Sequence, residues 1–322
     1  MGAPVNVAVI GVGSMGKNHA RVYSEMSNVN LVGISDLDEE SCKNYAKQFN
    51  TEYFKDYRDL FGKVDAVNLA VPTTLHHKMA MEFLSHGIHV LVEKPISNML
   101  FEAKEIVDFA KKNDLVLQVG HLERFNPAVI QFKKMVSSPL FIQSHRIGYP
   151  SSRNLDVGVI WDLMIHDFDI LLSFVKTPVA DVQAYGLSLY SKKEDAAHVQ
   201  ILFENGSIAS LFASRISGER YRHLKVIEAS KTFNLDFINQ TLSIVNLPKE
   251  GHTNPPEFVP IKKSEPLRLE LEHFMDCIVG HKTPMVTGED GKNALQLAIK
   301  AVDNMKMVRI ADCPNPEKFL HM

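Results

Sequence analysis

Hydrophobic positions follow two different patterns along the chain, and the change falls near residue 122. From Val5 to Gly120, short and nearly continuous apolar runs alternate with segments of helical periodicity. Continuous runs rich in β-branched residues are typical of parallel strands that are covered on both faces. The predicted strands are Val5–Ile10, Leu31–Ile34, Ala66–Val71, Ile88–Val92 and Leu115–Val119, with predicted helices at residues 15–27, 38–49, 75–86 and 99–113. This alternation predicts βαβ units in a doubly wound parallel sheet.

The second half carries alternating apolar and polar positions, which predict antiparallel strands with unlike faces. These segments are Val179–Tyr190, Ala197–Phe203, Ser207–Ser214, Leu224–Glu228 and Thr232–Phe237. Helical patterns follow Asn126 and span Asp162–Val175, Leu267–Val279 and Lys292–Val308. Residues 247–266 hold five of the fifteen prolines and predict a loop. We expect an α/β protein with two domains, residues 1–122 and 123–322, in which the C-terminal helix can pack back on the first domain.

Charge and cysteine content exclude several classes of protein. The 35 Lys and Arg residues against 38 Asp and Glu residues give a net charge of −3, which argues against binding to nucleic acid or to an anionic membrane. The three cysteines, Cys42, Cys277 and Cys313, are far apart and form no CxxC pair, so a disulfide scaffold and a zinc ribbon are not expected. No apolar stretch approaches the roughly 20 residues of a membrane span. We expect a cytoplasmic protein.

A glycine-rich turn joins the first predicted strand to the first predicted helix. Residues 11–16 read Gly-Val-Gly-Ser-Met-Gly, which is GxGxxG in the strand–turn–helix setting that the motif requires. The first glycine permits the tight turn, the second lets a pyrophosphate approach the backbone, and the third lets helix and strand pack closely. The free N–H groups of the helix N-terminus would bind the phosphates. The residues predicted to bind the cofactor here are Gly11, Gly13, Ser14, Met15 and Gly16.

An acidic residue follows the second predicted strand. Asp36 lies 20 residues after Gly16, where a carboxylate can hold the ribose hydroxyls of a dinucleotide. Residues 38–40 are Asp-Glu-Glu, so a 2′-phosphate would meet repulsion and no arginine. We therefore predict NAD as the cofactor rather than NADP. The same three acids also favour a helix N-terminus, and both interpretations can hold together.

The carboxyl end of the predicted strand Ile88–Val92 is followed by Glu93, Lys94 and a proline. Ligands of open α/β sheets lie beyond the carboxyl ends of the strands, so we expect Lys94 near the nicotinamide end of the cofactor. Pro72 and His76 follow the preceding strand and share that edge. We count Glu93, Lys94, Pro72 and His76 in the predicted cofactor site. The alternatives are a solvated lysine and a loop histidine without chemistry.

Polar residues recur along the helical pattern of residues 162–175. Asp162, His166, Asp169 and Ser173 fall at helical spacing on one face. A carboxylate and an imidazole facing an alcohol suit proton transfer near neutral pH. The solvated face of an amphipathic helix is an equally good interpretation. A metal site is the third, but without HExxH or a cysteine ligand we predict no metal.

These motifs together resemble the Gfo/Idh/MocA family of sugar and polyol dehydrogenases. The matching residues are Gly11–Gly16, Pro72 with His76, Glu93-Lys94-Pro95, Arg124-Phe125-Asn126-Pro127, and Gly158 through Asp162, His166 and Asp169. The resemblance implies an N-terminal Rossmann domain and a C-terminal α/β domain with a large, open, mostly antiparallel sheet. It also implies that Lys94, Asp162 and His166 match the catalytic lysine, aspartate and histidine of the family.

Two segments depart from the common family pattern. Many members have glycines around the catalytic aspartate, whereas this chain reads Asp-Val-Gly-Val-Ile-Trp-Asp over residues 156–162, and many have an aromatic residue at the position of His121. The segments 120–127 and 162–167 resemble a narrower branch that includes UDP-N-acetylglucosamine 3-dehydrogenases and related nucleotide-sugar oxidoreductases. A diphosphate would need cationic contacts, for which Arg124, Arg146 and Arg153 are candidates. Together with Asn126, Asp162 and His166, Arg124 and Arg153 form the predicted substrate site.

We therefore expect an NAD-dependent dehydrogenase that oxidises a ring hydroxyl of a sugar, with UDP-N-acetylglucosamine at C3 as the first candidate. If the active site lies in the cleft between the domains, Lys94 converges there with Asp162 and His166. An inositol or free-sugar dehydrogenase of the same family is the alternative enzyme. A non-catalytic NAD-binding redox regulator is the alternative of another class, although it would need no acid–base group. The open sheet predicts a homodimer or homotetramer.

Overall fold

The computed structural model describes residues 4–150, 156–247 and 254–309, and these divide into two compact units. The first unit comprises residues up to Phe125 together with Ser264–Leu295, and the second comprises Asn126–Lys263 and the residues from Gln296 onward. Residues 264–295, which the sequence analysis assigned to the second half, are thus grouped with the first unit. No helix in the described ranges is long and apolar enough to cross a membrane.

A six-stranded parallel sheet forms the centre of the first unit. Its strands are β1 (Val5–Ile10), β2 (Val29–Ser35), β3 (Glu52–Phe54), β4 (Ala66–Leu69), β5 (His89–Glu93) and β6 (Leu117–Gly120). Their order in the sheet is β3-β2-β1-β4-β5-β6, so the direction of winding reverses between β1 and β4. This confirms the predicted doubly wound sheet. β3 was missed because three residues are too few to show a pattern.

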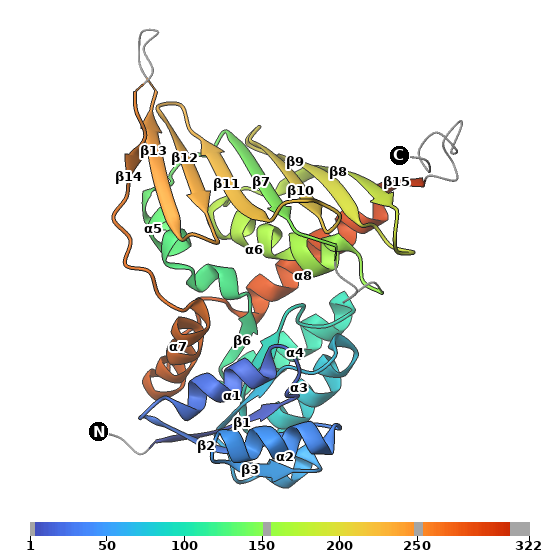
Figure 1. The fold of residues 1–322 in the computed structure, drawn as a ribbon, viewed down its shortest axis with the longest axis vertical. Helices are drawn as coiled ribbons and strands as arrows, with labels where there is room; N and C mark the ends of the chain where they lie inside the picture. The colour runs from blue at the N-terminus through green and yellow to red at the C-terminus, as the bar shows by residue number, and fades with distance from the viewer. Residues whose placement is uncertain (1–3, 151–155, 248–253, 310–322) are drawn as a thin grey trace. The chain divides into compact units, whose positions relative to one another are not determined.

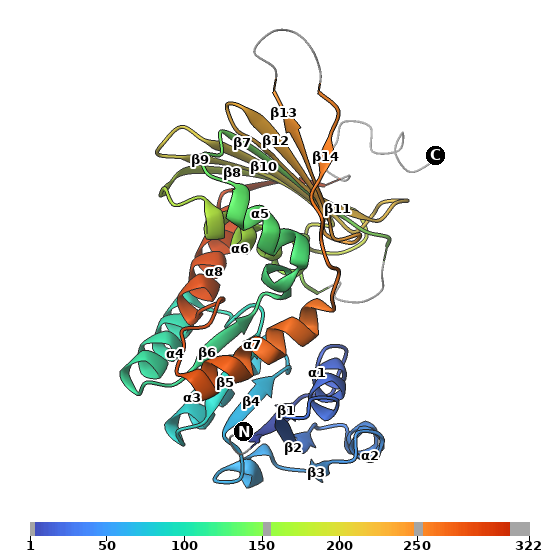
Figure 2. The same ribbon diagram turned by 90° about the vertical axis from the view of Figure 1, so that its left-hand side faces the viewer.

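Helices cover both faces of this sheet (Figures 1 and 2). The helices α1 (Gly16–Ser24), α2 (Glu39–Gln48) and α7 (Pro266–Gly280) lie on one face, where a single hydrophobic cluster joins them to the strands. The helices α3 (His76–Ser85) and α4 (Leu100–Lys112) lie on the other. Short 3-10 turns are η1 (Tyr57–Leu60), η2 (Thr73–Leu75) and η3 (Leu122–Phe125). Double coverage explains why the predicted strands are apolar throughout.

A nine-stranded sheet forms the second unit. Its strands are β7 (Phe141–Ile147), β8 (Val179–Ser188), β9 (Ala196–Phe203), β10 (Ile208–Ser214), β11 (Tyr221–Ile227), β12 (Lys231–Asp236), β13 (Thr241–Asn246), β14 (Glu257–Phe258) and β15 (Met305–Arg309). Their order is β14-β13-β12-β11-β7-β10-β9-β8-β15. All neighbours are antiparallel except β7 with β10 and β8 with β15. The predicted α/β class, with a parallel sheet followed by a mostly antiparallel one, is confirmed.

One face of this sheet is covered by α5 (Pro127–Met135) and α6 (Ile165–Phe174), which pack through Phe132 and Phe174. Within the described part of the second unit no helix lies on the other face (Figures 1 and 2). That face carries Tyr185 and Leu202, which remain 45% and 42% exposed. The alternation read from the sequence therefore reflects a sheet with one buried and one open face.

Two predicted helices differ from the structure. The helix expected over Lys292–Val308 is α8 (Gly288–Asp303), which ends before strand β15. Residues 305–309 instead pair in parallel with β8. Their side-chain pattern fits a strand at a sheet edge as well as the last turn of a helix, so the sequence did not distinguish the two. The helix expected from Asp162 begins as a π-helical turn, η4 (Ile160–Met164), and becomes α6 only at Ile165.

Candidate active site

The glycine-rich turn is shaped by its backbone. Gly11 has φ +86°, and a Cβ there would lie 2.6 Å from the Ala70 carbonyl oxygen. A Cβ on Gly16 would collide with the Gly11 carbonyl oxygen. A Cβ on Gly13 would have no atom within 4 Å, so this glycine faces open space. Two glycines thus let β1, β4 and α1 pack closely, and the third leaves the surface open where a pyrophosphate would bind.

Asp36 is hydrogen-bonded to this turn. Its Oδ2 accepts a bond of 2.6 Å from the Val12 N–H, and its Oδ1 accepts one of 2.9 Å from the Asp38 N–H. The carboxylate is thereby fixed at the end of β2, next to the glycines, where the sequence predicted the ribose contact. The turn and Asp36 therefore fit the adenosine and pyrophosphate parts of NAD.

The acids after Asp36 also organise helix α2. Asp38 is its N-cap and accepts bonds from the Ser41 N–H and hydroxyl, of 3.1 and 2.6 Å. These bonds lower the pKa of the Asp38 carboxyl, the hydroxyl more than the backbone N–H. Glu39 and Glu40 occupy the first turn, where negative charge is favourable. The capping interpretation of residues 38–40 is thus confirmed, and it leaves their charge beside Asp36 unchanged.

His76 connects the ends of two strands. Its ring is 1% exposed, with Nδ1 2.8 Å from the Pro95 carbonyl oxygen and Nε2 2.9 Å from the Val71 carbonyl oxygen. Burial lowers the pKa of the imidazole although both carbonyls favour its protonated form. The ring therefore links the segment after β4 to the segment after β5, which is the edge where the sequence predicted it. It is a buried residue at the start of α3, bonded through its ring, rather than a loop histidine.

Lys94 follows β5 directly and is half-buried. The preceding Glu93 accepts bonds at Oε2 from the Lys94 N–H, of 3.2 Å, and at Oε1 from His19 Nε2, of 3.0 Å. Burial acts to raise the pKa of the Glu93 carboxyl, but the hydrogen bond and charge of His19, followed by the charge of Lys94, outweigh it and leave the pKa lowered. The first unit thus brings the glycine turn, Asp36, His76, Glu93 and Lys94 to the carboxyl edge of its sheet.

Asp162 and His166 lie one turn apart in the second unit, the former in η4 and the latter in α6, and both are half-buried. Further along the same face, Asp169 and Ser173 are only 2% and 5% exposed. A uniformly solvated helix face is therefore excluded. The described residues contain no group of three or more His, Cys, Asp or Glu side chains that could hold a metal ion.

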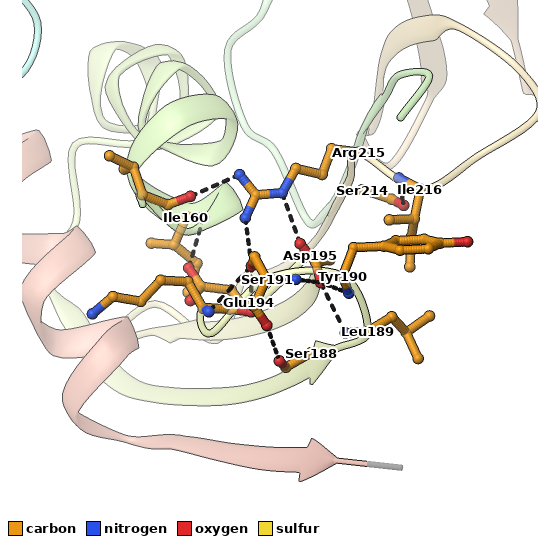
Figure 3. Close-up of polar contacts among 12 residues, drawn as sticks. Ile160, Ser188, Leu189, Tyr190, Ser191, Glu194, Asp195, Ser214, Arg215 and Ile216 are labelled. Carbon is orange, nitrogen blue, oxygen red and sulfur yellow. Dashed lines mark hydrogen bonds and ion pairs between the residues drawn. The ribbon is translucent and has the colours of Figure 1, made fainter. Parts of the chain in front are cut away.

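The π-helical turn that carries Asp162 is anchored by Glu194. Its Oε1 accepts a bond of 3.1 Å from the Ile160 N–H (Figure 3). Its carbonyl oxygen accepts one of 3.1 Å from the Val159 N–H. A side chain on Gly158 would collide with this carboxylate, which is why glycine stands there. Single π turns occur frequently at functional sites. The backbone at Asp162 is held directly, because its N–H donates to the Gly158 carbonyl.

A second buried pair supports the same turn. Arg215 Nε donates to Asp195 Oδ1 at 2.9 Å (Figure 3). Its Nη1 donates to the Val157 carbonyl at 2.7 Å. Burial opposes ionisation of Asp195, but three backbone N–H groups, of residues 189–191, keep its pKa well below the usual range. The β8–β9 connection is thus tied to the segment that leads into η4.

Three cations and one amide were predicted to contact substrate, and the structure gives most of them other partners. Arg124 is 3% exposed and pairs with Asp290 at 3.1 Å. Arg146 is 1% exposed and forms two bonds to Asp167, so it is not a surface contact for a diphosphate. Asn126 caps α5, with Oδ1 accepting from the Ala128 N–H. Arg153 lies outside the described residues.

Sequence reasoning missed Asp167, Glu194 and Arg215. Their partners are 20 to 58 positions away, and no local motif marks such pairs. The one available signal was Gly158, a glycine shortly before a predicted helix.

Comparison with known proteins places the chain in a family. Residues 5–121 match the oxidoreductase family with an NAD-binding Rossmann fold, and residues 142–233 match the GFO/IDH/MocA C-terminal domain. UDP-N-acetylglucosamine 3-dehydrogenase of Acidithiobacillus ferrooxidans is 31% identical over 92% of this chain and 96% of its own. The scyllo-inositol 2-dehydrogenase (NAD(+)) of Bacillus subtilis is 27% identical over 94% of each chain.

Solved structures agree with this assignment. A structure of the Acidithiobacillus ferrooxidans enzyme superposes with a TM-score of 0.89 at 30% identity, covering 94% of this chain and 98% of that one. Levoglucosan dehydrogenase in complex with NADH has the same fold, with a TM-score of 0.84 at 19% identity over 94% and 96% of the two chains. The chain therefore belongs to the Gfo/Idh/MocA family, and it is an NAD-binding oxidoreductase that acts on CH–OH groups.

Proposed function

We propose that the protein oxidises a ring hydroxyl of a nucleotide sugar to a ketone, with UDP-N-acetylglucosamine, oxidised at C3, as the first candidate substrate. The observation that carries the chemistry is the pair Asp162 and His166, a carboxylate and an imidazole one turn apart on an anchored helix. The relative of 31% identity supports the substrate, because it spans nearly the whole of both chains.

Three side chains have different roles at the substrate hydroxyl. His166 accepts its proton, since imidazole is suited to proton transfer near neutral pH. Lys94 polarises the hydroxyl and stabilises the alkoxide that develops. Asp162 orients the substrate. Bound NAD supplies the hydride acceptor at C4 of its nicotinamide. If Lys94 accepted the proton and His166 stabilised the alkoxide instead, the net reaction would be the same: one hydride goes to NAD and one proton to the protein.

An inositol or free-sugar dehydrogenase is the second candidate. Arg124 and Arg146 are buried and paired with Asp290 and Asp167, so two of the three predicted diphosphate contacts have other roles. A substrate without phosphates needs none of these contacts. Relatives named inositol dehydrogenases support the same alternative, including myo-inositol 2-dehydrogenase of Thermotoga maritima at 25% identity.

A substrate screen separates the candidates. Reduced cofactor is measured at fixed NAD with UDP-N-acetylglucosamine, N-acetylglucosamine, scyllo-inositol and myo-inositol. Turnover of the nucleotide sugar alone supports the first candidate, and turnover of an inositol or free sugar supports the second. NAD binding without turnover of any of them would favour a redox regulator and overturn both.

Assembly and location complete the proposal. The open face of the nine-stranded sheet exposes Tyr185, Leu202 and Val308, a combination suited to burial against a second copy. We propose a homodimer or homotetramer, which this surface supports, and a cytoplasmic location, with which the free thiols of Cys42 and Cys277 are compatible.

A further inference from the structure

A carboxylic acid is buried in the core of the first unit without a bonding partner. Glu270 of α7 is 0% exposed, and neither of its carboxyl oxygens has a hydrogen-bond partner among the described residues. Burial raises the pKa of this carboxyl well above its usual range, and the charge of Glu93 raises it further. Both effects favour the protonated form of the side chain.

Glu270 and Glu93 approach the same face of the parallel sheet. Leu91 and Glu93 of β5 pair with Gln118 and Gly120 of β6. These four positions therefore lie on the face of the sheet that α1 and α7 cover. Gln118 Nε2 donates to the main-chain oxygen of Glu270 at 3.3 Å, which places Glu270 against β6. A Cβ on Gly120, one pleat further, would lie 2.9 Å from Glu93 Oε2. The missing side chain of Gly120 leaves room for the Glu93 carboxylate.

The other polar groups on this face form one chain of hydrogen bonds. The Tyr23 hydroxyl donates to Asn68 Oδ1 at 2.8 Å, and Asn68 Nδ2 donates to His19 Nδ1 at 2.8 Å. His19 Nε2 lies 3.0 Å from Glu93 Oε1 and joins this chain to the carboxylate. The charge of Lys94 adds to the effect of His19 in favouring the ionised form of Glu93.

Packing does not explain Glu270. A buried polar group without a hydrogen bond costs stability, and a leucine or methionine at this point of a hydrophobic cluster would avoid that cost. Buried acids with a strongly shifted proton affinity and a specific charged neighbour are typical of functional sites. The neighbour here is the residue that precedes Lys94.

We propose that Glu270 and Glu93 form a buried acid pair that holds a single proton beside Lys94. Glu270 carries the proton and Glu93 stays ionised, so Lys94 faces one negative charge rather than two. Glu270 is thus a positioning residue that acts through Glu93 on the charge of Lys94. The inference rests on the proposed function in one respect, because that function assigns Lys94 to the substrate hydroxyl.

Infrared difference spectroscopy tests the acid pair without any turnover. At pH 8 ordinary carboxyls are ionised, so the carbonyl band of a protonated carboxyl reports buried acids alone. We expect this band in the wild-type protein and its loss in Glu270→Gln. Glu272→Gln, the same change two positions along α7 at a partly exposed residue, retains it. Absence of the band in the wild type, or its persistence in a folded Glu270→Gln or Glu270→Met, overturns the proposal.

Titration of Lys94 tests the coupling. The side-chain carbon resonance of Lys94, assigned by its loss in Lys94→Arg, is followed against pH in protein carrying 13C-labelled lysine. Glu93→Gln removes the single negative charge, and we expect the midpoint to fall by about one pH unit or more. Glu270→Gln, which imitates the protonated acid, leaves the midpoint unchanged, whereas the loss of an ionised carboxylate at this position would lower it.

The two tests separate the inference from the proposed function. An unchanged Lys94 midpoint in Glu93→Gln, or a lower one in Glu270→Gln, contradicts the acid pair whatever the enzyme does. A protein with the infrared band and the expected midpoints, but without dehydrogenase activity, keeps the acid pair and contradicts the proposed function.

Discussion

Arg146 and Asp167 form a buried ion pair that fixes helix α6 to strand β7. Nε and Nη2 of Arg146 donate to the two carboxylate oxygens of Asp167 at 2.9 and 3.0 Å, and both residues are at most 4% exposed. The Ser144 hydroxyl adds a third bond to Asp167, of 2.9 Å. Because Asp167 directly follows His166, this pair sets the orientation of the helix at the proposed proton acceptor.

Removal of one partner should be far more harmful than removal of both. Arg146→Met leaves an uncompensated buried carboxylate and should cost about 3–5 kcal/mol of unfolding free energy. The double variant Arg146→Met/Asp167→Leu should recover most of that loss, since well-packed apolar residues often replace a buried pair without cost. Urea unfolding measures both, with the exposed Lys111→Met of α4 as the control. Equal losses in the single and double variants would contradict this account.

Cofactor preference should depend on Asp36. We expect the wild-type protein to bind NAD more tightly than NADP, because the ribose contact and the neighbouring acids both disfavour a 2′-phosphate. Asp36→Ala should weaken NAD binding and narrow the preference. Calorimetry with both cofactors measures this, and Glu52→Gln, which removes an exposed acid on β3 that has no assigned role in cofactor binding, serves as the control. Tighter binding of NADP by the wild type would contradict the assignment.

Self-association should depend on the open sheet face. We expect a dimer or tetramer at micromolar concentration by light scattering. Leu202→Glu places a charge on this face and should shift the protein toward the monomer, whereas Glu52→Gln on β3 of the other unit should not. A wild-type monomer at this concentration would refute the assembly.

Most of the parallel sheet could be predicted because both of its faces are covered and its strands are therefore apolar throughout. Strand β7 of the nine-stranded sheet could not be predicted. Its inward positions include the polar residues Ser144 and Arg146, which both donate to Asp167 and hide the alternation of apolar and polar positions. The grouping of α7 with the first unit has no local signal either, because it follows from packing against α1.

The residues of the candidate site likewise include some that the sequence marks and some that it does not. Gly11, Asp36 and Lys94 are marked by spacing relative to strand ends, which the sequence displays. Glu194 and Glu270 are not marked, because each acts on a residue remote in sequence and neither belongs to a motif. Long-range polar contacts in a core are decided by the fold, and a single sequence carries no record of them.

The pH dependence of stability should reveal Glu270. Its pKa is raised in the folded protein, so above the ordinary glutamate pKa the unfolded chain releases a proton that the folded chain retains. The unfolded state then binds fewer protons, and this residue lowers stability as pH rises from about 4.5 toward the raised pKa. We expect Glu270→Gln to gain stability relative to the wild type as pH increases from 5 to 8. A pH-independent difference, measured by urea unfolding, would contradict the raised pKa.

The chemistry should depend on Lys94 and His166 together. Removal of a group that acts mainly in the transition state lowers turnover and spares cofactor affinity. Lys94→Met and His166→Asn should each reduce turnover by at least roughly 10²-fold, the lower end for one acid–base or electrostatic group. The double variant should be little worse than either single one, because groups that act as a unit are not additive. NAD affinity should change by only a few-fold.

Steady-state kinetics and cofactor titration measure these effects, with the exposed Lys111→Met as the matched control for loss of a lysine. The competing interpretation, a solvated Lys94 and a helix without chemistry, predicts nearly normal rates for all three variants. A drop in turnover together with a drop in melting temperature would indicate damage to the fold, so both are measured on the same samples. Full activity in a Lys94→Met protein with an unchanged melting temperature would falsify the assignment of the catalytic residues. Only the assignment of the NAD-binding residues would then remain.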